Sequence, residues 1–280
     1  MIGVIDVGGG NRGAFGAGIF DYCMDNNIEF DYCIGVSAGA ANCASYVAGQ
    51  RGRNYEFYTK YNLSRKAINP AKFFVHKSVI NLDYIYGTLS NSGGKSPLDY
   101  PAMMKAKKKF VVVTEEAKTG RPKYFTKEDM SQNDYGIICA SSCMPIVNKP
   151  YIVNGEPYYD GGIADPIPID KALKDGCDKV VVILTLPKDY FRDNSSEARF
   201  ADRIKEFPAS RQAVIDRAEL YNRELGQILD LEKEGKVLII SPKERAKIRT
   251  LGKDTSVIDN LYHEGYKKAS KIKKFINSNG

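Results

Sequence analysis

Short apolar runs alternate along the chain with longer stretches in which apolar residues recur at helical spacing. The runs are typical of buried strands and cover residues 2–7, 32–34, 110–114, 123–125, 179–186 and 236–240. Helical spacing predicts helices at residues 14–24, 97–107, 135–142, 209–232 and 256–276. Because no linker or repeat interrupts this alternation, the pattern predicts one α/β domain over residues 1–280 with a mostly parallel sheet.

Two further stretches refine this prediction. The turn Asn154-Gly155 separates two short strand-like pieces, 151–153 and 157–159, and so predicts a β-hairpin. Residues 54–63 and 71–89 are rich in aromatic and other apolar side chains and predict helices and loops. They suit a lid or the wall of an acyl-binding pocket, although ordinary core packing explains each aromatic residue equally well.

The composition is that of a globular protein and narrows the range of partners. The chain carries 41 Lys and Arg against 34 Asp and Glu, a net charge of +7. This diffuse excess favours an anionic surface or substrate and does not indicate a nucleic-acid partner. The densest basic runs, 105–109 and 267–274, lie beside apolar residues, so lysines extended along the protein surface explain them as well as lipid headgroups do.

The cysteines and the N-terminus bear on metal binding and location. The six cysteines include no C-x-x-C pair, and only two histidines accompany them, so we expect reduced core residues and no zinc site. No apolar run approaches about 20 residues, and the first residues enter a strand pattern without a signal-peptide composition. We therefore expect a cytoplasmic protein, with peripheral membrane contact left open and no oligomeric state specified.

A glycine-rich loop follows the first predicted strand and precedes the first predicted helix. Its N–H groups are expected to point outward and to favour negative charge; it comprises Gly8, Gly9, Gly10, Asn11, Arg12 and Gly13. The same G-x-G-x-x-G spacing occurs in dinucleotide-binding folds, and Asp25, Glu29 and Asp31 stand near the place of the ribose-binding acid. Against that alternative, the next strand ends in a serine-containing turn.

That turn is the pentapeptide Gly35-Val36-Ser37-Ala38-Gly39. It lies between an apolar run and a stretch of small residues that favours helix, which is the context of a nucleophile elbow. Gly35 and Gly39 allow the close backbone approach that such an elbow demands. Loops that leave neighbouring parallel strands lie side by side, so we expect the glycine-rich loop to present an oxyanion hole to Ser37.

A serine nucleophile needs a base, and the sequence offers two kinds. The order Ser37, Asp160, His263 is that of α/β-hydrolase triads, but His263 stands inside a predicted helix and the elbow follows only one strand and helix. We therefore treat His76 and His263 as structural or surface residues. Asp160 precedes Gly161 and Gly162 in a turn and becomes a suitable base if it is partly desolvated, although an ordinary β-turn is the simpler interpretation.

Taken together, GGGNRG at 8–13, GVSAG at 35–39 and DGG at 160–162 resemble the patatin-like phospholipase family. The resemblance extends to Ala140-Ser141-Ser142, Pro145 and residues 163–168, and so to most of residues 3–186. The segment 187–280 carries no diagnostic motif. The chain departs from the family at Val7, where glycine is usual, and at Asp165, where asparagine is common.

The resemblance implies a three-layer α/β/α fold and a serine lipid acyl hydrolase without metal or cofactor. It implies Ser37 as nucleophile and Asp160 as base, with no histidine. Main-chain N–H groups would form the oxyanion hole, from Gly8, Gly9, Gly10, Asn11, Arg12 and Ala38. A nucleotide-binding protein and a non-catalytic module with the same fold stay open as alternatives.

Overall fold

The computed structural model describes residues 1–61, 64, 66, 67, 78–145, 147–193, 201–245 and 254–278. One sheet has the order β5-β6-β3-β2-β1-β7-β8, and β4 pairs with β3. The strands β3, β2, β1, β7 and β8 are parallel, whereas β4, β5 and β6 are antiparallel to their neighbours. The bounds are β1 Ile2–Asp6, β2 Tyr32–Val36, β3 Lys109–Glu116, β4 Arg121–Thr126, β5 Tyr151–Val153, β6 Glu156–Asp160, β7 Lys179–Ile183 and β8 Val237–Ile240.

Helices connect these strands and cover both faces of the sheet. The α-helices are α1 Ala14–Asp25, α2 Ala38–Val47, α3 Arg53–Glu56, α5 Tyr100–Lys105, α6 Gly136–Ser141, α7 Ile169–Lys174, α9 Pro208–Lys233, α10 Thr255–Lys268 and α11 Ile272–Asn277. Shorter 3-10 turns are η1 Gly10–Gly13, η5 Lys127–Asp129, η6 Gly161–Ile163 and η7 Ala269–Lys271. Two segments, η2 Phe57–Tyr61 and η4 Asp83–Thr88, are π-helical.

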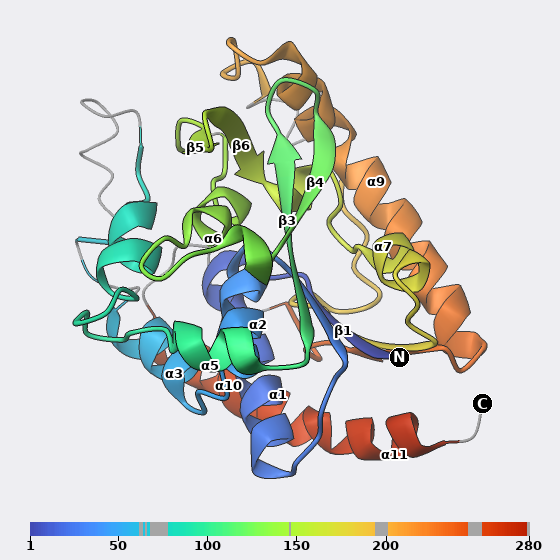
Figure 1. Cartoon of the computed structure of the whole chain (residues 1–280). Coiled ribbons are helices and arrows are strands. Elements are labelled where there is room, and N and C mark those ends of the chain that lie inside the picture. Colours follow the sequence, from blue (N-terminus) through green and yellow to red (C-terminus); the bar gives the residue numbers. More distant parts are fainter. Residues whose placement is uncertain are drawn as a thin grey trace.

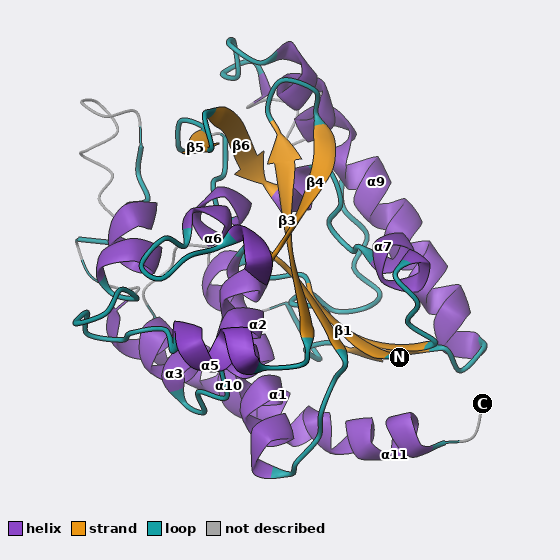
Figure 2. Cartoon of the chain, in the orientation of Figure 1, coloured by secondary structure: helices purple, strands orange, loops and turns teal. Residues whose placement is uncertain are grey.

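Alternation along the strands assigns their side chains to two separate cores. Val4, Cys33 and Val112 join a core formed with α1, α2 and α10. Their neighbours Ile5 and Ile34 point to the other face and pack with α7 and α9. Figure 1 shows these two sets of helices on opposite sides of the sheet, and the strands cross the middle of the molecule in Figure 2. The predicted three-layer α/β/α fold is therefore confirmed.

Most predicted elements are present with shifted ends, and one is wrong. The hairpin around Asn154-Gly155 and the helix at 209–232 are confirmed as β5–β6 and α9. The predicted helix at 256–276 is instead divided by the 3-10 turn η7. In a 3-10 turn, side chains three residues apart lie above one another, and Ala269 and Ile272 are both fully buried.

The stretch predicted as a lid or acyl-binding wall is described in part. Residues 62, 63, 65 and 68–77 lie outside the described residues, and His76 is among them. In the part of this stretch that is described, Ile80, Leu82 and Ile85 line the cavity that contains Ser37. In the segment after residue 186, α9 packs on one face of the sheet and α10 on the other. A single domain over 1–280 stays a prediction.

Candidate active site

Ser37 occupies a sharp turn between β2 and α2. Its backbone has φ 57° and ψ −131°, a conformation that residues with a side chain rarely adopt and that often accompanies function. The two flanking glycines are required by packing, because a Cβ at Gly35 would clash with Ala40 and one at Gly39 with the Asp6 carbonyl oxygen. The Ser37 N–H donates to Ser141 Oγ at 2.8 Å, which fixes the turn. This is the geometry of the predicted elbow.

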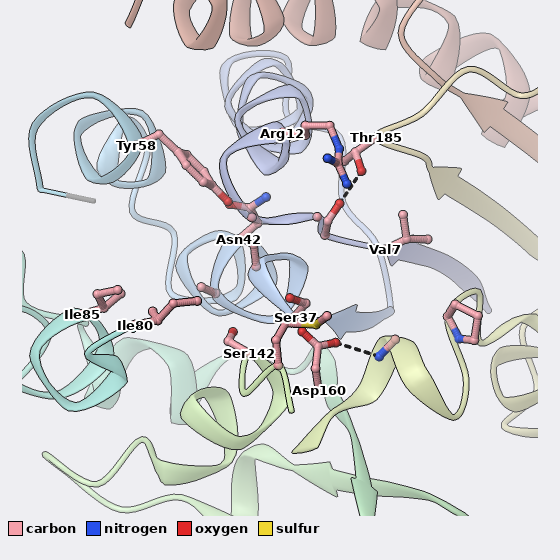
Figure 3. Close-up of a pocket in the computed structure, with 18 of the residues that line it drawn as sticks. Val7, Arg12, Ser37, Asn42, Tyr58, Ile80, Ile85, Ser142, Asp160 and Thr185 are labelled. Atoms are coloured by element: carbon pink, nitrogen blue, oxygen red, sulfur yellow. Dashed lines mark hydrogen bonds between the residues drawn. The ribbon is translucent and has the colours of Figure 1, made fainter. Parts of the chain in front are cut away.

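The sheet register explains how Ser37 and Asp160 meet. β2 pairs with β3 as far as Val36 opposite Val113, and β6 ends with Asp160 opposite Thr114, the next residue of β3. β4 pairs with residues 111–116 of β3, so β2 and β6 must share the other edge of β3 and run toward each other. Figure 3 shows the Ser37 and Asp160 side chains next to each other.

Asp160 is buried, with 2% of its surface exposed. Its Oδ1 accepts a hydrogen bond from the Gly162 N–H at 2.8 Å. Burial raises the pKa of Asp160 above its ordinary value; the Ser37 hydroxyl and the positive charge of Arg217 oppose this rise. Arg217 also donates from Nε to the Gly162 carbonyl at 2.5 Å, which joins α9 to the turn that follows Asp160.

The glycine-rich loop lies against the start of α2. Gly8, Gly9 and Gly10 all have positive φ (66°, 119° and 59°), and a Cβ at Gly8 would clash with the Val36 carbonyl. The Gly8 N–H donates to Asp6 Oδ1 at 2.9 Å, so this predicted oxyanion donor is already engaged. Thr185 donates to the Gly8 carbonyl and holds the loop from the residues after β7 (Figure 3). Gly9 and Gly10 donate to no acceptor among the described residues.

A buried polar network beneath both turns was not predicted from the sequence. The Asn42 Nδ2 group donates to Asp6 Oδ2 at 2.8 Å and to the Gly13 carbonyl at 2.9 Å. Tyr58 donates to Asn42 Oδ1 at 3.1 Å. Burial raises the pKa of Asp6 to about 6, against the hydrogen bonds from Asn42 and Gly8. The sequence does contain one signal of this network: Asn42 is a polar residue five positions after Ser37, in a helix that consists largely of small residues.

The two turns open into one cavity of about 250 Å³. Eight of the predicted site residues line it: Gly8, Gly9, Gly10, Arg12, Ser37, Ala38, Asp160 and Gly162. Asn11, Gly13, Gly35, Gly39 and Gly161 support the turns from outside the lining. An apolar wall continues from Ser37 toward Ile80 and Ile85, which Figure 3 shows on the side of the cavity away from Thr185. Such a wall suits an acyl chain.

The residues of the alternative interpretations lie elsewhere. His263 is on α10 with 68% of its side chain exposed, 3.5 Å from Asp259, and it does not line the cavity. Asp31 accepts from the N–H of Ile2 at the amino end of β1, whereas the glycine-rich loop leaves the carboxyl end. Asp25 pairs with Arg51 and Glu29 with Lys108. None of the three acids considered for a bound ribose therefore lies beside the glycine-rich loop.

Potential metal ligands and cysteines add no further site. Among the described residues, no group of three or more His, Cys, Asp or Glu side chains is arranged to hold a metal ion. All six cysteines are buried and outside disulfides, as predicted for reduced core residues. Burial raises the pKa of each thiol, which lowers its reactivity.

The fold and the serine turn define an α/β protein of the nucleophile-elbow type. A model of the patatin-like phospholipase family matches residues 7–173. The chain therefore belongs to the patatin-like phospholipase family, and membership supports a lipid acyl hydrolase in general terms. A second model, of a domain of unknown function (DUF6363), matches residues 207–278.

Two individual proteins are similar to this chain. The uncharacterized protein YjjU of Escherichia coli strain K12 is 30% identical over 195 residues, or 68% of this chain and 53% of that protein. The chain thus spans about half the length of the curated relative it matches. The crystal structure of VipD from Legionella pneumophila aligns with a TM-score of 0.48 and 14% identity, over 96% of this chain and 66% of that one. In the described part of the chain, no helix combines the length and apolarity needed to cross a membrane.

Proposed function

We propose that this chain is a serine acyl hydrolase that cleaves the ester bonds of lipids with a Ser37–Asp160 dyad. Ser37 Oγ attacks the ester carbonyl carbon while its proton passes to the Asp160 carboxylate. Collapse of the tetrahedral intermediate breaks the ester bond, and the departing alcohol takes the proton from Asp160. Asp160 then accepts a proton from water, whose oxygen attacks the acyl-enzyme carbonyl carbon. As the bond to Ser37 Oγ breaks, Asp160 returns the proton to that oxygen, and the fatty acid is released.

The observation that carries this proposal is the placement of Ser37, on a strained turn, beside a buried carboxylate in one cavity. Hydrogen bonds and nearby positive charge favour the ionised form of Asp160. Burial raises its pKa and so makes the carboxylate a stronger base. The neighbouring apolar wall gives an acyl chain a place to lie. Asp160 is the one carboxylate among the described residues that line the cavity, and it lies beside Ser37, where it can take the proton.

The oxyanion is best assigned to the N–H groups of Gly9, Gly10 and Ala38. Gly9 and Gly10 donate to no described acceptor, and Ala38 begins α2, where N–H groups are unpaired and the helix dipole is positive. Gly8 is a poorer candidate because its N–H is held by Asp6. Loss of one such donor is expected to raise the barrier by about 3 kcal/mol. We further propose a cytoplasmic location with peripheral contact to lipid surfaces, in keeping with a lipid substrate.

Labelling with a fluorophosphonate probe tests the nucleophile, and Ser142→Ala supplies a matched control. Ser142 lines the same cavity and donates to Tyr86 at 3.3 Å. We expect the wild type and Ser142→Ala to become labelled and to hydrolyse a medium-chain p-nitrophenyl ester. Ser37→Ala and Asp160→Asn should lose activity by about 1,000-fold or more, and Ser37→Ala should not label. Labelling of Ser37→Ala would reject the assignment, and retention of a nicotinamide or flavin nucleotide would favour the nucleotide-binding alternative.

A further inference from the structure

Helix α9 binds the segment that follows Asp160 at two points. Arg217 Nε donates to the Gly162 carbonyl at 2.5 Å, and Glu224 accepts from the Ile167 N–H at 2.7 Å. The two side chains are seven positions apart, so they lie on one face of the helix. The helix therefore holds a backbone carbonyl and a backbone N–H of the segment that follows the proposed base.

This helix lies outside the part of the chain that matches the patatin-like family. The family model matches residues 7–173, whereas α9 falls in the domain of unknown function at 207–278. Arg217 nevertheless lines the cavity that contains Ser37 and Asp160. The C-terminal segment is thus in direct contact with the proposed reaction centre.

Gly162 is held at both of its backbone polar groups. Its N–H donates to Asp160 Oδ1 at 2.8 Å, and its carbonyl accepts from Arg217. A Cβ at this position would lie 3.1 Å from Asp160 Oδ1 and 3.5 Å from Arg217 Nη2, so the carboxylate and the guanidinium both lie close to the Gly162 backbone. A shift of that backbone would therefore move the N–H group that orients the Asp160 carboxylate.

Other contacts fix the turn only up to the preceding residue. The Asp160 N–H donates to the Cys143 carbonyl at 2.9 Å. Gly161 packs closely on β3, because a Cβ there would lie 2.2 Å from the Val113 carbonyl oxygen. Arg217 extends this support to Gly162, the residue whose N–H binds the carboxylate.

The charge of Arg217 acts on the same carboxylate. The titratable or charged side chains that face Asp160 are Ser37 of the elbow, Arg217 of α9, Arg192 of the connection after β7, Tyr86 of η4 and Cys143 after α6. Burial raises the pKa of Asp160, and the Ser37 hydroxyl followed by the charge of Arg217 lowers it. Arg192 acts in the same direction but more weakly.

We propose that Arg217 is a positioning residue for the proposed base: its bond to the Gly162 carbonyl fixes the Gly162 N–H, which directs the Asp160 carboxylate toward Ser37. This inference rests on the proposed function and gives the domain of unknown function a role in it, as the supplier of Arg217. Because Arg217 acts through Asp160, its loss should lower kcat and leave KM nearly unchanged. The loss of its charge should also favour the protonated form of Asp160.

Substitutions of Arg217 test this proposal with a neutral, soluble p-nitrophenyl ester. Arg217→Gln should lower kcat on the alkaline plateau by about 10-fold or more and change KM by less than about 2-fold. It should also move the acid limb of kcat/KM up by about one pH unit. Arg217→Lys keeps the charge but not the planar guanidinium, so its limb should stay within about 0.3 pH unit of the wild type while kcat falls.

Arg211→Gln is the matched control, and it should leave kcat and the acid limb unchanged. Arg211 is exposed on the same helix and pairs with Asp202. An equal shift of the limb in Arg211→Gln would overturn the proposal, as would a loss in Arg217→Gln that falls on KM instead of kcat. If circular dichroism shows Arg217→Gln to be unfolded, Arg217→Lys decides, and wild-type kcat in that variant would overturn the proposal.

The Asp160 carboxyl group can also be followed without an ester. In protein with ¹³C-labelled aspartate carboxyls, the Asp160 resonance is the one that disappears in Asp160→Asn. It should titrate at higher pH in Arg217→Gln than in the wild type and Arg211→Gln, and an unchanged titration would overturn the proposal. Since this measurement needs no turnover, a wild type that shows the expected titration but hydrolyses no ester would reject the proposed function instead.

Discussion

Asp160 sits in an environment that raises its pKa while keeping its carboxylate in contact with a hydroxyl. A general base acts in its deprotonated form, so kcat/KM falls as pH drops through the pKa of that base in the free enzyme. Because burial is the largest influence on Asp160, the acid limb should lie above the ordinary aspartate pKa of 3.8. Under the proposed mechanism, the limb reports the Asp160 carboxyl group.

This gives a prediction for the pH dependence of ester hydrolysis. The kcat/KM profile of the wild type should lose activity on acidification with a midpoint above 3.8, and His263→Gln should leave that midpoint unchanged, since His263 lies outside the cavity lining. The measurement is initial rate at low concentration of a soluble ester across the acidic and neutral range. A limb that disappears in His263→Gln would show that imidazole is the base.

The sequence indicates the two residues of the proposed dyad better than the buried contacts that support them. Ser37 and Asp160 could be predicted because each stands in a turn with local glycines, and local patterns survive without tertiary information. The contact between Asp6 and Asn42 could not, because it joins β1 to α2, and the sequence around Asn42 marks a polar position without showing its partner. The engagement of the Gly8 N–H follows from the same buried Asp6. Because the sequence does not reveal this contact, it predicts Gly8 as an oxyanion donor although the Gly8 N–H is already engaged.

At the scale of elements, two glycines determine how closely α1 and α10 pack. A Cβ at Gly18 would clash with the Tyr262 carbonyl, and one at Gly265 would clash with the Phe15 carbonyl. The two helices thus approach through reciprocal backbone contacts, and Tyr262 adds a hydrogen bond to Asp21 at 2.8 Å. Helical periodicity predicted both helices but gave no partner for either, because periodicity shows which face is buried and not which element covers it.

Two glycine-to-alanine substitutions should therefore have opposite effects on stability. Gly265→Ala should destabilise the fold by about 2 kcal/mol or more, since backbone cannot move aside as a side chain can. Gly226 lies within α9, where an added Cβ would have no atom within 4 Å, so Gly226→Ala should stabilise by up to about 1 kcal/mol. Urea denaturation measures both. Because both changes restrict the unfolded chain similarly, destabilisation by Gly226→Ala equal to that by Gly265→Ala would contradict the packing argument.

At the scale of the whole molecule, several carboxyl groups are buried away from the proposed reaction centre. Burial raises the pKa of Glu115 to about 7 and that of Asp165 to about 6. Burial, together with the charge of Asp165, raises the pKa of Glu224 to about 9. These groups connect layers: Tyr124 of β4 donates to Asp165, and Glu224 of α9 accepts from the Ile167 N–H at 2.7 Å.

The sign of the resulting pH dependence follows from proton counts. Between the ordinary carboxyl pKa and the raised native values, the native chain binds more protons than the unfolded chain, so the free energy of unfolding falls as pH rises. The contribution is fully present near pH 4 and is lost by about pH 9, where Glu224 ionises. The contribution of these carboxyl groups to the free energy of unfolding should accordingly be larger at pH 5 than at pH 9.

Glu224→Gln isolates this effect, because the amide oxygen can still accept from Ile167 while the amide N–H₂ replaces the carboxyl proton toward Asp165. From pH 5 to pH 9 the variant should lose less stability than the wild type, by on the order of 2 kcal/mol, in urea denaturation at fixed ionic strength. Glu219→Gln, exposed on the same helix, removes the same charge and should change with pH as the wild type does. Equal pH dependence in all three proteins would mean that Glu224 is ionised in the native state at neutral pH. The Glu224 carboxylate would then accept from the Ile167 N–H as an ion and would share no proton with Asp165.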